Sequence, residues 1–145
     1  MALDTHGNFV LGNDLGNLLA FTPTGQLAYH FEVSGAITGR PAVDAQGQIA
    51  FGSANGQLYV LSPEGQERFR FATGGAIAAA PVVDARGTLY VGSRDDFLYA
   101  IASDASLAWR YNVGQDIDAA VIITADGALY AASDRGVLLA FPKDP

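Results

Sequence analysis

Two histidines, His6 and His30, are the side chains of this sequence that could act as bases near neutral pH. A nucleophilic catalyst also needs a reactive side chain, a base beside it and a third group that orients the base. The chain has no cysteine, which excludes disulfides and thiolate metal sites. A histidine-based zinc site would need further ligands, and none cluster in the sequence. We therefore expect both histidines at the surface, and no catalytic residue, metal or cofactor.

A second group of candidates contains charged residues at positions where related segments of the chain carry mostly small residues. In steps of 40 residues, for example, Asp96 aligns with three glycines, at positions 16, 56 and 136. The acidic residues of the group could bind a basic peptide segment or a cation. The alternative is that these are surface loops whose sequences have drifted. The candidate binding residues are Arg40, Arg94, Asp95, Asp96, Asp116 and Asp118.

The same interval runs through the whole chain. Gly87 aligns with glycines at 7, 47 and 127, and Asp84 aligns with aspartates at 4 and 44 but with Thr124 in the last copy. Gly92 aligns with glycines at 12 and 52, and with Ala132. A repeat that keeps its register without insertions indicates a repeat architecture. We predict a single domain over residues 1–145, with units 1–40, 41–80, 81–120 and an incomplete 121–145.

Each unit contains four short apolar runs separated by turn residues. In the third unit, the runs rich in β-branched and aromatic residues are typical of strands. No window shows a helical period over ten or more residues. Four antiparallel strands per roughly 40 residues are typical of a β-propeller blade, so we predict an all-β propeller of about 3.5–4 blades. The predicted strands of this unit are Ile77–Val83, Thr88–Gly92, Phe97–Ile101 and Leu107–Val113.

Residues 81–111 carry a more specific pattern, P-V-V-D-x-x-G-T-L-Y-V-G-S-x-D-x-x-L-Y-A-I followed by W-R-Y. This pattern resembles the pyrroloquinoline-quinone (PQQ) type propeller repeat of quinoprotein dehydrogenases, the periplasmic barrel-assembly lipoprotein and extracytoplasmic sensor domains. The WD repeat fits less well, because the chain has neither a Gly-His nor a Trp-Asp pair. The resemblance implies that Trp109 docks neighbouring blades, with Phe69 and Tyr29 as its aromatic substitutes. It also implies a periplasmic or extracellular location.

The resemblance does not extend to quinone chemistry. A quinoprotein dehydrogenase would call for adjacent cysteines, a tryptophan stacked on the cofactor and an acidic base beside Ca²⁺. This chain has no cysteine, and its one tryptophan occupies the docking position. We therefore interpret the chain as a non-enzymatic scaffold or protein-interaction module. Two alternatives remain: a propeller enzyme or metal-dependent ligand-binding domain with an acidic site at the channel mouth, and an engineered or excised fragment without separate activity.

Charge and hydropathy exclude several classes of partner. The net charge of −7 would repel nucleic acid and anionic membrane surfaces. No run approaches the roughly 18 apolar residues of a membrane span. The first residues, Met-Ala-Leu-Asp, do not resemble a signal peptide, although the first unit begins part-way through its repeat, as in a cut-out of a longer chain.

The number of blades raises the question of how the ring closes. After a stub at Met1–Leu3, the chain completes three blades and adds Ala119–Ile123, Ala128–Ala132 and Val137–Phe141. Propellers close with at least four blades, and rings of the resembled family usually need about seven or eight. An unpaired edge on Val137–Phe141 would invite pairing with another chain. We expect a second copy to complete a homodimeric ring of roughly eight blades, or a related open association. An excised piece of a longer protein is the alternative.

Overall fold

The computed structural model describes residues 1–142, which form fifteen β-strands and no helix. The predicted all-β propeller fold is confirmed, because the strands form four antiparallel sheets that follow one another along the chain. We number these sheets as blades 1 to 4. Blade 1 contains β1 (Ala2–Leu3), β2 (Phe9–Gly12), β3 (Asn17–Phe21) and β4 (Leu27–Glu32). Blade 2 contains β5 (Ala42–Val43), β6 (Ile49–Gly52), β7 (Gln57–Leu61) and β8 (Glu67–Ala72).

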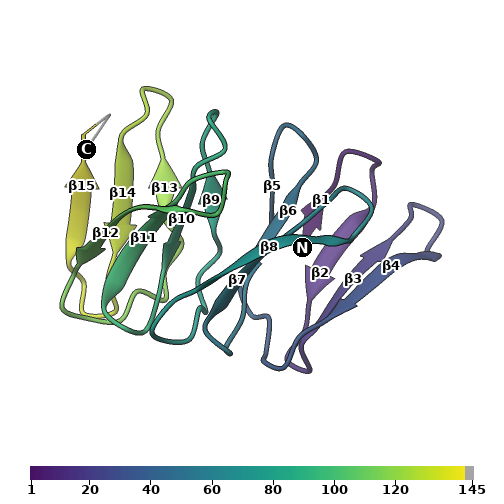
Figure 1. Cartoon of the computed structure of the whole chain (residues 1–145), viewed down its shortest axis with the longest axis horizontal. Coiled ribbons are helices and arrows are strands. Elements are labelled where there is room, and N and C mark those ends of the chain that lie inside the picture. The colour runs from purple at the N-terminus through teal and green to yellow at the C-terminus, as the bar shows by residue number, and fades with distance from the viewer. Residues whose placement is uncertain (143–145) are drawn as a thin grey trace.

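Blades 3 and 4 continue the pattern, and Figure 1 shows the four sheets side by side in one row. Within every blade the strands pair in chain order, so each blade is a meander with its first strand innermost and its last strand at the rim. Blade 3 contains β9 (Val82–Val83), β10 (Leu89–Gly92), β11 (Phe97–Ile101) and β12 (Leu107–Asn112). Blade 4 contains β13 (Ile122–Ile123), β14 (Leu129–Ala132) and β15 (Leu138–Phe141).

In blades 1 to 3, an aspartate organises the turn between the first two strands. In blade 3 the Asp84 carboxylate accepts hydrogen bonds from the backbone N–H groups of Arg86 and Thr88, both at 2.8 Å. The Gly87 N–H then closes the turn on the Asp84 carbonyl at 3.0 Å, and Gly87 has a φ of +83°. Glycine adopts this conformation without steric cost. The aspartates at these positions are therefore engaged in holding the turn.

The predicted first strand, Ile77–Val83, is wrong over most of its length, because β9 covers only Val82–Val83. Residues 77–81 instead form part of the link between blades 2 and 3. The Ile77 N–H donates to the carbonyl of Ser53 at 3.0 Å, and Pro81 has no N–H to donate. The backbone of this link is thus hydrogen-bonded to a turn and is not available to a sheet.

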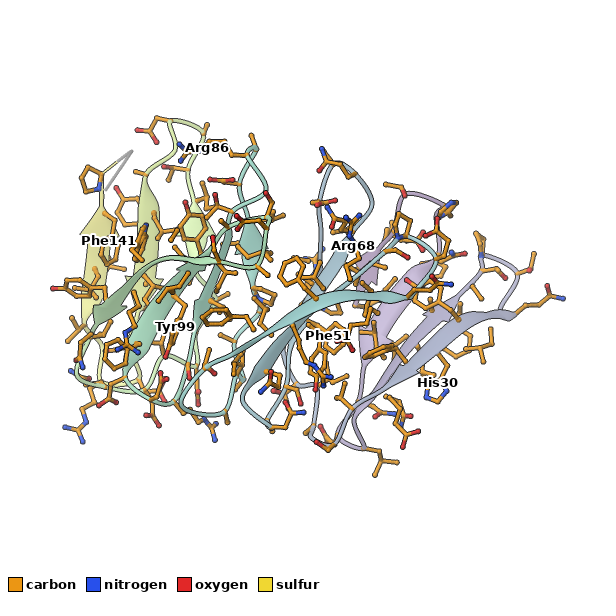
Figure 2. All side chains as sticks on the ribbon, in the orientation of Figure 1. His30, Phe51, Arg68, Arg86, Tyr99 and Phe141 are labelled. Atoms are coloured by element: carbon orange, nitrogen blue, oxygen red, sulfur yellow. The ribbon has the colours of Figure 1, made fainter. Side chains whose placement is uncertain are left out.

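Apolar side chains from facing sheets form three core layers, one between each pair of neighbouring blades. Between blades 1 and 2, Val10 and Leu18 lie in the same buried cluster as Phe51 and Leu61. The Phe51 ring stacks on Tyr59, with centroids 5.3 Å apart, and Figure 2 shows Phe51 inside this layer. Because blades 2 and 3 contribute to two layers each, their central strands are buried on both faces. The stacking of blades therefore supplies the hydrophobic core.

The turns between the third and fourth strands give a first testable prediction. Gly25 and Gly65 have φ values of +83° and +81°, whereas the equivalent residue of blade 3 is Ala105, with a φ of +69°. An L-residue pays a steric penalty in this conformation. We therefore expect Ala105→Gly to raise the free energy of unfolding by about 0.5–1 kcal/mol in urea titrations. The matched control is Gly25→Ala, where an added Cβ meets no atom within 4 Å, and it should lower stability by a similar amount. A loss of stability in Ala105→Gly would contradict the argument.

Candidate functional site

The links between blades and the turns between second and third strands lie at one end of the sheets, where they hydrogen-bond to one another. The carbonyl of Ala76, in the link after blade 2, accepts the backbone N–H of Arg94 of blade 3 at 3.0 Å. Ala36 and Ala54 repeat this contact at 2.9 Å between blades 1 and 2, and the Asp116 carbonyl accepts the Asp134 N–H at 3.2 Å. This end of the molecule therefore collects the links and the second-to-third-strand turns, with most of the candidate residues on them.

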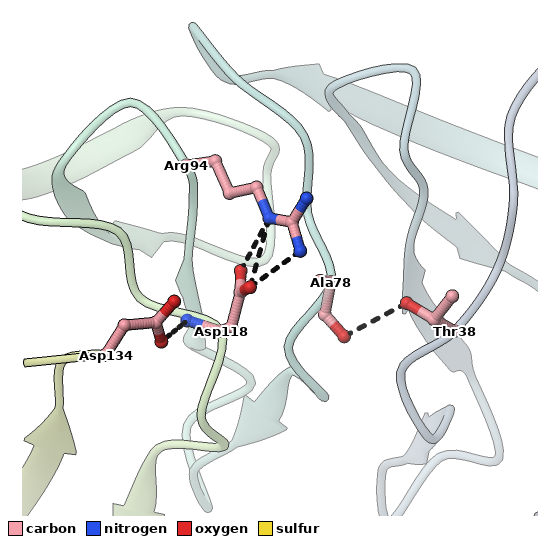
Figure 3. Close-up of polar contacts among 5 residues, drawn as sticks. All are labelled: Thr38, Ala78, Arg94, Asp118 and Asp134. Carbon is pink, nitrogen blue, oxygen red and sulfur yellow. Dashed lines mark hydrogen bonds and ion pairs between the residues drawn. The ribbon is translucent and has the colours of Figure 1, made fainter.

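Arg94 and Asp118 form the central ion pair of this end. Arg94 donates from Nε to Oδ1 of Asp118 at 2.8 Å and from Nη2 to Oδ2 at 2.7 Å, a bidentate arrangement (Figure 3). The Asp118 N–H donates to Oδ1 of Asp134 at 3.3 Å. The hydrogen bonds from Arg94 hold the pKa of the Asp118 carboxyl below its ordinary value, against the opposing effect of burial. The pair ties the turn of blade 3 to the link that leads to blade 4.

Asp95 lies beside this pair in sequence but makes different contacts. Its Oδ2 accepts the backbone N–H of Gly74 and the hydroxyl of Tyr99, each at 2.6 Å. Burial disfavours the charged form, yet the hydrogen bonds from Tyr99, Ser93 and two backbone amides outweigh it and lower the pKa of the Asp95 carboxyl. Because Gly74 belongs to the link before blade 3, Asp95 joins two blades.

Sequence reasoning did not reveal this joining role, although the preceding blade carries a signal for it. Asn55, one repeat earlier, donates from Nδ2 to the hydroxyl of Tyr59 at 2.9 Å and to Oγ of Ser34 at 3.2 Å. An Asn or Asp followed four residues later by tyrosine thus recurs in blades 2 and 3. The recurrence marks a contact with the preceding link.

The other candidates are more separated. Asp96 is partly buried with a φ of +71°, and its carbonyl accepts the Val113 N–H at 2.8 Å. Asp116 is near enough to Arg94 to contribute, with Asp134, to the raised pKa of the arginine, whose main cause is the hydrogen bonding to Asp118. Arg40 lies elsewhere, in a hollow of about 460 Å³ that the innermost strands of blades 1 to 3 line. The structure therefore brings Arg94, Asp116 and Asp118 together and leaves Arg40 apart.

The two histidines lie at exposed positions on blade 1. His30 shares a 2.6 Å hydrogen bond between its Nε2 and Oδ1 of Asn17, and Figure 2 shows it on the rim strand β4. His6 stands in the turn that Asp4 organises, with its backbone N–H donated to that carboxylate at 2.8 Å. Within residues 1–142, no three side chains of His, Cys, Asp or Glu are grouped so that they could hold a metal ion.

Trp109, on the rim strand β12, lies between blades 3 and 4. Its ring centroid is 5.9 Å from that of Tyr90 in its own blade and 5.6 Å from that of Phe141 in blade 4. The equivalent aromatic residues Tyr29 and Phe69 pack against the core layers that follow blades 1 and 2. Each of these side chains thus extends a core layer towards the rim.

Comparisons with known proteins identify this arrangement of blades. Residues 15–144 match the family of the outer membrane protein assembly factor BamB. The chain belongs to the BamB family. The crystal structure of BamB from Moraxella catarrhalis superposes with a TM-score of 0.80 at 24% sequence identity, over 96% of this chain and 44% of that chain. The computationally designed Ika4 protein gives a TM-score of 0.82 at 15% identity, over 94% of this chain and 85% of Ika4.

Sqt1 from Saccharomyces cerevisiae has a TM-score of 0.81 at 13% identity, over 95% of this chain and 42% of Sqt1. A search of curated protein sequences gave no match.

The resemblance to the PQQ-type propeller repeat is confirmed by the BamB family match and by the superposition on BamB. In the described part of the chain, no helix has the length and apolarity needed to cross a membrane.

Proposed function

We propose that this BamB-type chain is a non-enzymatic scaffold for protein interaction, and that two copies join end to end to complete a propeller ring of about eight blades. The observation that carries the proposal is the apolar character of its two end faces, on blade 1 and blade 4. These faces correspond to the two surfaces that meet between neighbouring blades inside the chain. A periplasmic or extracellular location follows from the family resemblance as part of the same proposal.

The free face of blade 1 exposes residues that are buried in the other blades. Phe9 is 37% exposed, whereas the equivalent Ile49 and Leu89 are 0% and 4% exposed because the preceding blade covers them. Leu3, at the start of the same blade, is 58% exposed. An uncovered apolar surface of this kind marks a site of contact.

The free face of blade 4 corresponds to the surface that, in blades 1 to 3, packs against the following blade. Leu138 is 68% exposed, although its equivalents Leu18, Leu58 and Leu98 are fully buried against the following blade. Ile122 on the same blade is 61% exposed. Blade 4 of one copy can therefore pack on blade 1 of another by the contact that blades 1 to 4 already use. Two such head-to-tail contacts close a ring when the rotation is right.

The length of the Moraxella catarrhalis relative supports this stoichiometry. This chain spans 44% of that BamB, which is therefore a little more than twice as long as the matched part. About two copies of the present chain contain a comparable number of repeats. Burial of a large apolar side chain contributes about 1.5–3 kcal/mol, so several leucine and phenylalanine side chains per contact are enough to offset the cost of association.

The native mass tests the proposal directly. Sedimentation equilibrium at micromolar concentration should give twice the 15.1 kDa mass of one chain. Negative-stain images of the same sample should show closed rings. A species with the mass of a single chain at tens of micromolar would reject the homodimer and favour the interpretation as an excised piece of a longer propeller.

We further propose that the scaffold presents its acidic end to a basic segment of a partner protein. Asp116 and Asp134 lie near the Arg94–Asp118 pair, and Asp96 follows Arg94 by two residues in the same turn, on a chain of net charge −7. Charges of one sign on one face accelerate encounter with a segment of opposite sign and select against acidic partners. Asp95 and Asp118 are already hydrogen-bonded within the fold, so Asp96 and Asp116 are the carboxylates to vary.

A lysine-rich peptide is the probe for this end. The double variant Asp96→Asn/Asp116→Asn should weaken its binding about tenfold in fluorescence titrations at low salt, because two nearby carboxylates are neutralised. The matched control Glu64→Gln/Asp104→Asn removes the same charge from turns at the opposite end of the sheets. Equal weakening by both pairs would show that only net charge matters and would refute a site at this end.

A further inference from the structure

We propose that the outer edge of β15 is an acceptor site for an extended segment of another polypeptide, with aromatic residues at alternate positions and a basic residue between them. Blades 1 to 3 each have a fourth strand at the rim, whereas β15 is the last strand of blade 4 among the described residues. Ring closure would cover the end face of blade 4 and would leave this edge free. The inference therefore goes beyond the proposed ring.

The backbone of β15 presents hydrogen-bonding groups to this edge. The carbonyl of Val137 accepts the N–H of Ser133 at 2.9 Å, so the backbone groups of Val137 face β14. In an antiparallel strand these groups alternate between the two neighbours. The N–H and C=O groups of Leu138 and Ala140 consequently point away from β14. Such an unpaired row is a ready template for an added strand.

Blade 3 shows what the same edge binds when it is paired. The Val113 N–H donates to the Asp96 carbonyl at 2.8 Å, so the alternate residues Leu98 and Ala100 direct their backbone groups to the rim strand β12. These two residues lie one repeat before Leu138 and Ala140. Blade 4 therefore offers an incoming strand the same two positions as blade 3.

The register of the three complete blades defines the side chains of the incoming segment. In blade 3, Leu98 pairs with Tyr111 and Ala100 pairs with Trp109, on the face towards blade 4. In blades 1 and 2 the partners at these positions are also aromatic, namely Phe31 and Tyr29, then Phe71 and Phe69. The residue between the two aromatic side chains is His30, Arg70 or Arg110. Leu138 and Ala140 should thus each receive an aromatic side chain.

The basic residue contributes less than the aromatic pair. In the complete blades it has a local partner: His30 bonds to Asn17, Arg70 lies 3.3 Å from Glu67, and Arg110 stacks 4.6 Å from the centre of the Phe97 ring. Blade 4 has Val137 in place of Asn17 and Phe97, and the valine side chain has neither an amide oxygen nor an aromatic ring. A basic residue in the incoming segment would therefore be favoured only by its general electrostatic attraction to a chain of net charge −7.

The probe is the blocked heptapeptide Leu-Ala-Trp-Arg-Tyr-Asn-Val, the sequence of residues 107–113. The readout is amide hydrogen exchange of the full chain, followed residue by residue by NMR. At saturating peptide, exchange should slow at least tenfold at Leu138 and Ala140 and should not change at Leu139, whose N–H already faces β14. Equal protection of all three amides would overturn the proposal. The absence of protection at millimolar peptide would also overturn it.

Two matched variants separate strand addition from simple apolar adsorption. N-methylation of the peptide at its tyrosine blocks an N–H that would face β15, whereas N-methylation at its arginine blocks one that faces solvent. The first change should abolish protection and the second should preserve it. On the protein, Ala140→Pro removes an outward N–H while the ladder to β14 is kept, so peptide affinity should fall at least tenfold. Unchanged affinity in Ala140→Pro would overturn the proposal, as would protection of Leu138 and Ala140 before any peptide is added.

Discussion

Replacement of Gly52 by alanine is expected to lower the free energy of unfolding by about 3 kcal/mol. A Cβ at this position would lie 2.0 Å from Cγ2 and 2.7 Å from Cβ of Ile77. Ile77 is fully buried in the layer between blades 2 and 3, and its N–H is hydrogen-bonded to the Ser53 carbonyl. The isoleucine therefore cannot withdraw without loss of a link between blades. Equilibrium unfolding in urea measures the effect.

The chain provides controls for this steric explanation. Adding Ile77→Ala to Gly52→Ala frees the space, so the double variant should lose less stability than the sum of the two single variants. Ala132 occupies the equivalent position of blade 4, and Ala132→Gly should cost only about 0.5–1 kcal/mol through chain entropy. If Gly52→Ala unfolds at the same urea concentration as the unmodified chain, the close packing of link on strand is contradicted.

The same contact explains which parts of the fold the repeat could predict. Glycine at 12, 52 and 92 recurs because the Ile37, Ile77 and Ile117 side chains each lie against it, and the repeat made this position visible in the sequence. The central strands could also be predicted from the sequence, and the predicted Phe97–Ile101 coincides with β11. Burial on both faces makes these strands continuously apolar, which is a local signal.

The links between blades were less predictable. Ile77–Val83 looks like a strand because its residues are apolar, but the apolarity reflects burial of a link beneath the next blade. Similarly, the bidentate contact of Arg94 with Asp118 joins residues 24 positions apart, across a turn and a link. A repeat pattern shows where copies differ, so it singled out both residues. It does not show that their charges neutralise each other.

Replacement of Leu138 by glutamate is expected to convert the proposed dimeric ring into monomers. In the contact between blades, the equivalent leucines are fully buried, so each contact would lose the burial of an apolar side chain and would have to desolvate a carboxylate. The combined cost raises the dissociation constant by about a thousandfold or more. Sedimentation velocity at micromolar concentration should therefore show one species with the mass of a single chain.

The control for this variant is Leu107→Glu, on the rim strand β12. Leu107 is also an exposed leucine, but its equivalent in blade 2 is Glu67, so the fold already carries glutamate there. Leu107→Glu should leave the mass at that of two chains. Because Leu138 is exposed in the single chain, Leu138→Glu should unfold within about 0.5 kcal/mol of the unmodified monomer. If Leu138→Glu stays dimeric, the faces of blades 1 and 4 are not the contact, and assembly must use another surface.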